Sequence, residues 1–169
     1  MIHIYTGDGK GKTTSAAGLA IRGVGAGMRV FFFQFMKNGS SSEIKMLENM
    51  GIIVNCCQEC NKLTFLMNEE EFFAVRNTHN SMLEKAGSII ADGTADMVVL
   101  DEFINTYNSN LFDRELAEKI VLSKTNVEIV LTGRNTPKIF IDKADYVTIM
   151  QKEKHPYDKG VCARKGIEY

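Results

Sequence analysis

The chain has 169 residues, of which 44% are hydrophobic, and it carries a formal net charge of −1 at pH 7. This length and apolar content suit a single domain, and the near-neutral charge argues against nucleic acid as the main partner. We expect a cytoplasmic protein that binds no membrane, because the chain opens on a strand-like segment and has no apolar run near the ~18 residues that a membrane span requires.

A glycine-rich segment dominates the start of the chain. Residues 6–14 read Thr-Gly-Asp-Gly-Lys-Gly-Lys-Thr-Thr and lie between two apolar segments, residues 2–5 and 15–21. This order predicts a strand, a phosphate-binding loop and a helix whose N-terminus faces an anion. The candidate nucleotide-binding residues are Gly7, Asp8, Gly9, Lys10, Gly11, Lys12, Thr13 and Thr14. The alternative is a glycine turn that only caps the helix.

The spacing of this loop departs from the usual motif. Three residues, not four, separate Gly7 from the Gly11-Lys12 pair, and Thr6 occupies the position where the first glycine normally stands. We therefore expect the loop to hold phosphates in a different way. Lys12 supplies a positive charge and Thr13 a hydroxyl group for Mg²⁺.

Alternating strands and helices follow the loop. We predict a helix over 12–25, a buried strand within 28–36, a short helix ending at Met50 and a strand over 52–55. Ser40 and Glu43 have the spacing of a capping box at the start of this short helix. A role of Glu43 in the nucleotide site is the equally weighted alternative. A long helix over 69–92 is expected to bury Phe72, Phe73, Val75, Met82, Leu83, Ala86, Ile89 and Ile90. We predict that His79 on this helix lies at the surface.

The segment between residues 56 and 68 has no clear secondary-structure pattern. Its apolar part, residues 63–67, is either a core plug or a flap over a ligand. Cys57 and Cys60 form a lone CxxC pair, and a zinc site would require Cys56, Cys162 or a distant histidine as well. We favour reduced thiols near a strand end over a metal site.

Later strands are predicted over 96–100, 127–131 and 146–150, which completes an α/β fold with a mostly parallel sheet. Asp101 and Glu102 follow the first of these strands and, with Thr13, are the candidate Mg²⁺ ligands. One of the two acids instead caps a helix in the alternative interpretation. Arg134 follows the next strand and is expected to pair with phosphate, although a solvated arginine is nearly as plausible.

The basic tail, residues 152–169, contains Lys152, Lys154, His155, Lys159, Arg164 and Lys165. Four segments together resemble the ATP:corrinoid adenosyltransferases, the cob(I)yrinic acid a,c-diamide adenosyltransferase family. They are the short-spaced loop, Val98-Val99-Leu100-Asp101-Glu102, Leu131-Thr132-Gly133-Arg134-Asn135 and the tail motif Lys154-His155-Pro156-Tyr157-Asp158-Lys159-Gly160. The segments Gln34-Phe35-Met36-Lys37 and Gly166-Ile167-Glu168-Tyr169 also match, so the resemblance covers nearly the whole chain.

The resemblance implies one P-loop NTPase (RecA-like) domain over 1–169, with helices on both faces of the sheet and the tail closing on the site. It also implies transfer of the 5′-deoxyadenosyl group of ATP to the Co(I) of a reduced corrinoid, with release of triphosphate. Lys12, Thr13 and Glu102 would be the catalytic residues, with Mg²⁺ bound by Thr13, Asp101 and Glu102.

Further expectations follow from the family pattern. Phe65 takes the place of the family's Phe-x-Trp pair beside the corrinoid, since the corresponding stretch reads Leu63-Thr64-Phe65. A flavoprotein reductase is the expected electron donor and a homodimer the expected assembly. Family members carry residues before this first strand that help cover the site, so we expect the tail or a partner subunit to do so here. The rival functions are a small kinase or ATPase, and a module that binds nucleotide and corrinoid without chemistry.

Overall fold

A computed structural model describes residues 1–62 and 64–169. The strands are β1 (Ile2–Thr6), β2 (Val30–Gln34), β3 (Ile53–Cys56), β4 (Met97–Asp101), β5 (Glu128–Thr132) and β6 (Tyr146–Ile149). The helices are α1 (Lys12–Gly25), α2 (Ser42–Asn49), α3 (Glu69–Ala91), α4 (Phe103–Asn108), α5 (Arg114–Val121) and α6 (Lys138–Ile141). Two 3₁₀ turns cover Thr64–Leu66 and Pro156–Lys159.

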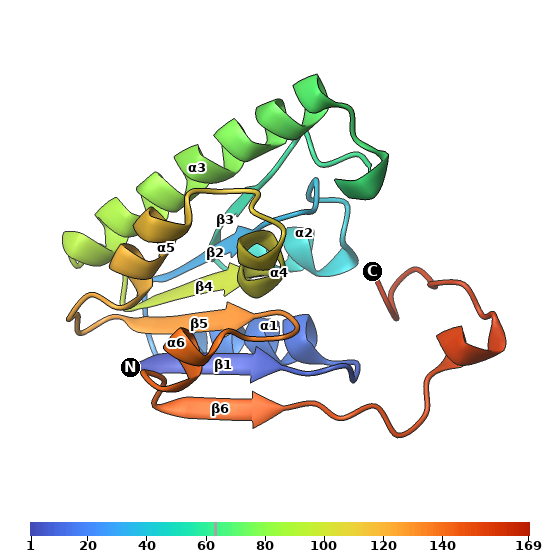
Figure 1. Cartoon of the computed structure of the whole chain (residues 1–169). Helices are drawn as coiled ribbons and strands as arrows, with labels where there is room; N and C mark the ends of the chain where they lie inside the picture. Colours follow the sequence, from blue (N-terminus) through green and yellow to red (C-terminus); the bar gives the residue numbers. More distant parts are fainter. Residues whose placement is uncertain (63) are drawn as a thin grey trace.

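The described strands form one six-stranded sheet in the order β3-β2-β4-β5-β1-β6 (Figure 1), and every neighbouring pair is parallel. The α/β fold with a parallel sheet is therefore confirmed. No helix in the described ranges combines the length and the hydrophobicity needed to cross a bilayer.

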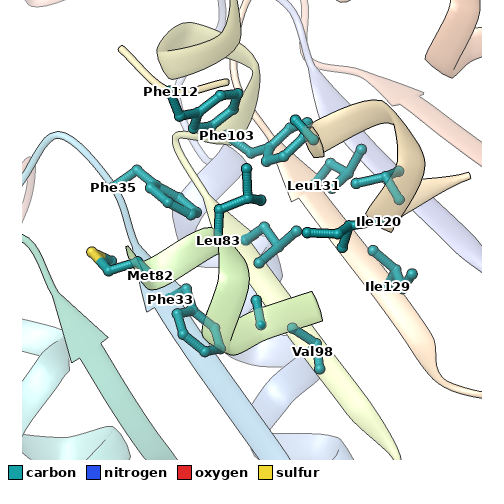
Figure 2. Packing of buried hydrophobic residues seen from close by; sticks show 14 of the residues in the cluster. Phe33, Phe35, Met82, Leu83, Val98, Phe103, Phe112, Ile120, Ile129 and Leu131 are labelled. Carbon is teal, nitrogen blue, oxygen red and sulfur yellow. The ribbon is translucent and has the colours of Figure 1, made fainter. Parts of the chain in front are cut away.

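Helices cover both faces of the sheet, because successive strand residues point to opposite sides. On β2, Phe32 packs with small residues of α1 such as Ala16 and Ala20, together with Leu47 of α2. Phe31 and Phe33 point to the other face, which α3 and α5 cover. Figure 2 shows the larger core on that face, where Phe33, Leu83, Phe103, Ile120 and Leu131 meet. The continuous apolar run of β2 was thus correctly interpreted as a strand buried on both faces.

The carboxyl ends of the strands gather polar groups at one edge of the sheet. Gln34 at the end of β2 is paired in register with Asp101 at the end of β4, and Thr132 at the end of β5 pairs with Tyr5 of β1. Each of these three polar side chains is buried. The glycine loop and α1 begin at the same edge, as expected for a site in an open parallel sheet.

Two predictions on α3 are wrong. His79 is fully buried instead of exposed, because the loop after β3 and the segment before α5 cover it: its ring contacts Cys60 and the carbonyl of Leu111. Phe73, expected in the core, is 57% exposed, because the first turns of α3 extend past the edge of the sheet (Figure 1).

The capping box predicted for Ser40 and Glu43 does not form. Ser41 is the N-cap of α2 and makes no side-chain capping bond. The Glu43 carboxylate instead accepts a hydrogen bond from Gln34 Nε2 at 3.4 Å, which places it beside the polar edge of the sheet. The short helices α4, α5 and α6 were not predicted.

Candidate functional site

The glycine loop, residues 7–11, packs against the end of β6. Gly7 and Gly11 have φ values of 105° and 116°, a region that favours glycine. The N–H of Gly9 donates to the Met150 carbonyl at 2.7 Å, and a Cβ on Gly9 would lie 2.8 Å from the same oxygen. Gly9 is thus required for the close approach of β6, and its N–H is paired within the protein rather than directed at an anion with its neighbours.

The ammonium group of Lys12 lies over this loop. Its Nζ donates to the carbonyl oxygens of Gly7 at 2.8 Å and Gly9 at 2.7 Å. Burial, and then the positive charge of Arg134, lower the pKa of Lys12 from its ordinary value. Two cations near one cavity favour an anionic ligand, because the ligand relieves their mutual repulsion.

The Asp101 carboxylate is the centre of a buried polar network. Oδ1 accepts hydrogen bonds from the hydroxyls of Thr13, at 2.8 Å, and Thr132, at 2.7 Å. Oδ2 accepts from Gln34 Nε2 at 3.1 Å and lies 3.5 Å from Lys37 Nζ. Asp101 therefore connects α1 to the ends of β2 and β5 and orients the Thr13 hydroxyl.

Glu102 lies beside this network in a left-handed backbone conformation, with φ 61°. Its N–H donates to Thr132 Oγ1 at 2.8 Å, and its carboxylate accepts a hydrogen bond from the Asn105 amide. Burial, and then the charge of Asp101, raise the pKa of Glu102. Burial alone would lower the pKa of Lys37, but Asp101 and Glu102 outweigh it, so that pKa is raised. Lys37 therefore carries a positive charge between the two acidic side chains.

Arg134 reaches the same edge from the loop after β5. Gly133 has φ 148°, and a Cβ there would lie 2.6 Å from the Cβ of Ile104, so only glycine allows α4 to pack this close. The N–H of Arg134 donates to Asn105 Oδ1 at 2.8 Å. The α4 helix thus holds the backbone of Arg134 while its side chain extends to the cavity.

A cavity of about 270 Å³ joins most of the predicted nucleotide-binding residues. It is lined by Asp8, Lys10, Gly11, Lys12, Thr13, Thr14, Lys37, Glu102, Asn105, Arg134, His155, Ile167 and Glu168. Residues from the glycine loop, from the segments after three strands and from the tail therefore share one space. Gly7 and Gly9 shape the loop but do not line this cavity, and Asp101 lies beneath it.

The tail leaves β6, swings outward and returns toward α2, where Ser42 Oγ donates to the carbonyl of Tyr169 at 3.0 Å (Figure 1). A second cavity of about 600 Å³ lies along it, between Asp8 and Arg134 on one side and Lys152, His155, Tyr157 and Asp158 on the other. The tail thus lines both spaces next to the glycine loop. Its closure over a ligand stays a prediction.

Phe65 lies apart from the phosphate cavity. Its side chain is 80% exposed and lines a separate cavity of about 300 Å³ with Met36, Cys60, Met67 and Leu111, among others. The structure therefore supports a surface flap over the core-plug alternative for this residue. Leu63, its neighbour in the predicted motif, lies outside the described residues.

Comparisons with known proteins agree with this geometry. The sequence profile of the family "ATP:corrinoid adenosyltransferase BtuR/CobO/CobP" matches residues 1–169. The chain belongs to this family. Among its relatives, Corrinoid adenosyltransferase CobA of Salmonella typhimurium is 33% identical over 100% of this chain and 85% of its own length. The corrinoid adenosyltransferases of Escherichia coli K12 and Pseudomonas aeruginosa are each 30% identical, over 100% and 98% of this chain and 85% and 82% of their own lengths.

Three residues that contact Asp101 were not assigned roles from the sequence: Gln34, Lys37 and Thr132. A polar residue at the end of an apolar strand was the available signal for Gln34 and Thr132, because the carboxyl edge of a parallel sheet is where ligands bind. Another cavity, of about 1030 Å³, lies at the opposite edge, beside Met28, Asp96 and Glu128. That edge is formed by the amino ends of the strands and is remote from the glycine loop.

Proposed function

We propose that the protein transfers the 5′-deoxyadenosyl group of ATP to the Co(I) ion of a reduced corrinoid and releases triphosphate. The observation that carries this proposal is the family match over residues 1–169. Relatives at 30% and 33% identity bear the name corrinoid adenosyltransferase. The cavity between the glycine loop and the tail supports it, because cations and helix N–H groups converge there.

The triphosphate would bind in this cavity. Lys12 now donates to two loop carbonyls, and phosphate oxygens would replace those acceptors. Arg134 and Lys37 line the same cavity and provide further charge. Because Gly9 donates its N–H to the carbonyl of Met150, just after β6, fewer loop amides remain for the ligand, and phosphate binding depends more strongly on these side chains.

The reaction requires no side-chain nucleophile. The electron pair of Co(I) forms a bond to the 5′ carbon while the bond from that carbon to the triphosphate oxygen breaks, and the triphosphate leaves with the electron pair of that bond. Lys12 and Arg134 would stabilise the negative charge that develops on the leaving group. Their positions beside the loop therefore serve both binding and the reaction.

Mg²⁺ is the proposed cofactor, and the oxygen donors at the strand ends fit its preference for hard ligands. The hydroxyl of Thr13 and the carboxylate of Glu102 line the cavity, while the buried Asp101 orients Thr13 and would act through it or through water. Bound Mg²⁺ would neutralise charge on the triphosphate. Thr13, Asp101 and Glu102 are thus the proposed metal-binding residues.

The corrinoid would lie near the flap that carries Phe65. An exposed aromatic side chain beside a partly apolar cavity suits a flat, partly apolar ligand. Phe65→Ala should slow transfer with cob(II)alamin reduced in situ more than with preformed cob(I)alamin, because Phe65 would keep water and the lower ligand off cobalt. Phe73→Ala, which also removes an exposed phenylalanine, is the matched control. Equal losses in both Phe65→Ala assays would argue against this role.

The reduced corrinoid requires an electron donor, for which a flavoprotein reductase is the proposed partner. A homodimer is the proposed assembly. Copurification with such a reductase and the mass of the protein in solution, by light scattering, test these two proposals separately.

The test of the function is anaerobic incubation with ATP, Mg²⁺ and cob(I)alamin, followed by chromatography of the phosphate products. Triphosphate formed in step with an alkylated corrinoid is the expected result. ADP with phosphate and an unchanged corrinoid would make the protein an ATPase. Intact ATP with both ligands bound would make it a binding module.

A further inference from the structure

Cys57, Cys60 and His79 form a compact cluster that the proposed reaction does not use. The two thiols follow β3, and His79 comes from the middle of α3. All three side chains are buried, and their ligand atoms lie within 4.8 Å of one another. Cys57 Sγ and Cys60 Sγ are 2.7 Å apart, and Cys60 Sγ is 3.5 Å from His79 Nε2.

The histidine ring is oriented as metal-binding histidines are. Its Nδ1 lies 3.2 Å from the carbonyl of Leu111, so Nδ1 carries the proton and donates it to that oxygen. Nε2 therefore holds a lone pair directed at the cluster. A backbone carbonyl bonded to the outer ring nitrogen is the usual support for a metal-ligating histidine, because it fixes the tautomer and the ring plane.

One hydrogen bond competes for that lone pair. The N–H of Met36 donates to His79 Nε2 at 3.1 Å. On metal binding this N–H would turn to the Cys60 sulfur, which lies 3.5 Å from Nε2, and would support the thiolate there. The exchange leaves no buried donor without a partner.

The two thiols face each other within the cluster. Binding of a divalent cation would release the thiol protons of Cys57 and Cys60 to solvent as the two thiolates form. Two thiolates, one neutral imidazole and one divalent cation sum to zero charge at the buried centre, and a Glu59 carboxylate in the fourth position would add its negative charge on the exposed side.

We propose that Cys57, Cys60 and His79 bind one Zn²⁺ ion, which fastens the loop after β3 to helix α3. Two thiolates and an imidazole are a ligand set typical of zinc. The Glu59 carboxylate, whose Oε2 lies 3.9 Å from Cys57 Sγ, is the candidate for the fourth position. The ion is structural and independent of the transferase reaction.

The geometry argues for this ligand set over the thiol pair that the sequence favoured. Sequence spacing provided only the two cysteines of the CxxC pair. Burial of His79 on the inner face of α3 adds the third ligand, and Leu111 fixes its tautomer. A single CxxC thus becomes a three-ligand site only in the folded chain.

The test measures metal in the whole protein purified without an affinity tag that binds metal. Mass spectrometry should find one zinc ion per chain, and apoprotein loaded with Co²⁺ should show a thiolate-to-metal charge-transfer band. Cys57→Ser, Cys60→Ser and His79→Asn should each lose stoichiometric zinc and weaken that band. Cys56→Ser is the matched control, since Cys56 adjoins the cluster without belonging to it, and it should bind zinc as the wild type does.

Because a ligand variant can fail to fold, circular dichroism of each variant accompanies the metal analysis. A wild-type protein with reduced thiols that takes up no zinc overturns the proposal. So does a Cys57–Cys60 disulfide in place of metal, found by mass spectrometry under air. Zinc that persists at full stoichiometry in a folded Cys57→Ser variant would also refute it.

Discussion

Replacing Asp101 with Asn removes one negative charge from the centre of the strand-edge network and keeps the shape of the side chain. The Asn carbonyl can still accept from Thr13 and Thr132, which now bond to Oδ1. The new amide would face two donors, Gln34 Nε2 and Lys37 Nζ. Gln34 can rotate its amide to accept from the new group, because its Oε1 has no partner among the described residues, but the rotation breaks its 3.4 Å hydrogen bond to Glu43. The uncompensated losses are therefore the ion pair with Lys37 and this long hydrogen bond.

The magnitude follows from this loss. Hydrogen bonds to charged groups contribute about 1.5–3 kcal/mol to the free energy of unfolding. Removing one partner of a buried ion pair also leaves the other charge buried without a counterion, which costs further stability. Glu102, 3.7 Å from Lys37, compensates part of that cost. We expect Asp101→Asn to lower the free energy of unfolding by about 1–3 kcal/mol, or Tm by about 2–12 °C for a chain of this length. Adenosyl transfer should fall about 100-fold or more, because Thr13 is no longer held by a carboxylate.

Urea titration and anaerobic transfer assays measure the two effects. Asp96→Asn is the matched control, since Asp96 pairs with Arg29 in an exposed salt bridge at the opposite edge of the sheet. That variant should keep full transfer activity and lose much less stability. An Asp101→Asn protein with wild-type stability and transfer rate would refute the role assigned to the network.

Three further predictions concern single side chains. Gly18→Ala should stabilise the protein by about 0.5–1 kcal/mol in urea titration, since a Cβ there meets nothing within 4 Å. Gly87→Ala should instead destabilise the protein by about 1–3 kcal/mol, because its Cβ would lie 2.7 Å from Ile120. Equal changes in the free energy of unfolding would contradict this pair of predictions. Lys12→Ala should lower transfer about 100- to 1000-fold with an unchanged circular dichroism spectrum, and an unchanged rate would rule out its assigned role. Folding raises the pKa of the Glu102 carboxyl above its value in the unfolded chain. The neutral form therefore contributes fully to stability below the unfolded pKa, and this contribution is lost as pH rises through the folded pKa. Glu102→Gln should therefore be more stable than wild type near about pH 7 and no different below about pH 4, and the reverse order in urea titrations at the two pH values would contradict the shift.

The sequence predicted those parts of the fold that local pattern determines. The glycine loop, the 14 residues of α1 and the apolar strands have strong local signals, and each lies where it was expected. The helices α4 and α6 contain only six and four residues, too few to show a helical period. Asp101 and Thr13 were correctly expected to meet, because both lie at the carboxyl edge of a parallel sheet.

The cluster around His79 shows what local pattern omits. His79 lies four residues after Val75 and four before Leu83, so helical spacing places it on the buried face of α3. Its polar neighbours in sequence obscured that position. The contact with Cys60, 19 residues away, arises only when the loop after β3 folds over α3. Tertiary packing, which no short window of sequence contains, thus decides both the burial of His79 and its partners.

The fate of the 5′ carbon of ATP tests the central proposal most directly. ATP labelled with ¹³C at that carbon is incubated anaerobically with Mg²⁺, cob(I)alamin and the protein, and the corrinoid product is examined by ¹³C NMR. A labelled carbon bonded to cobalt, in equal amount to the triphosphate released, is the predicted result. Label that stays in ATP or ADP, with none in the corrinoid, would contradict adenosyl transfer.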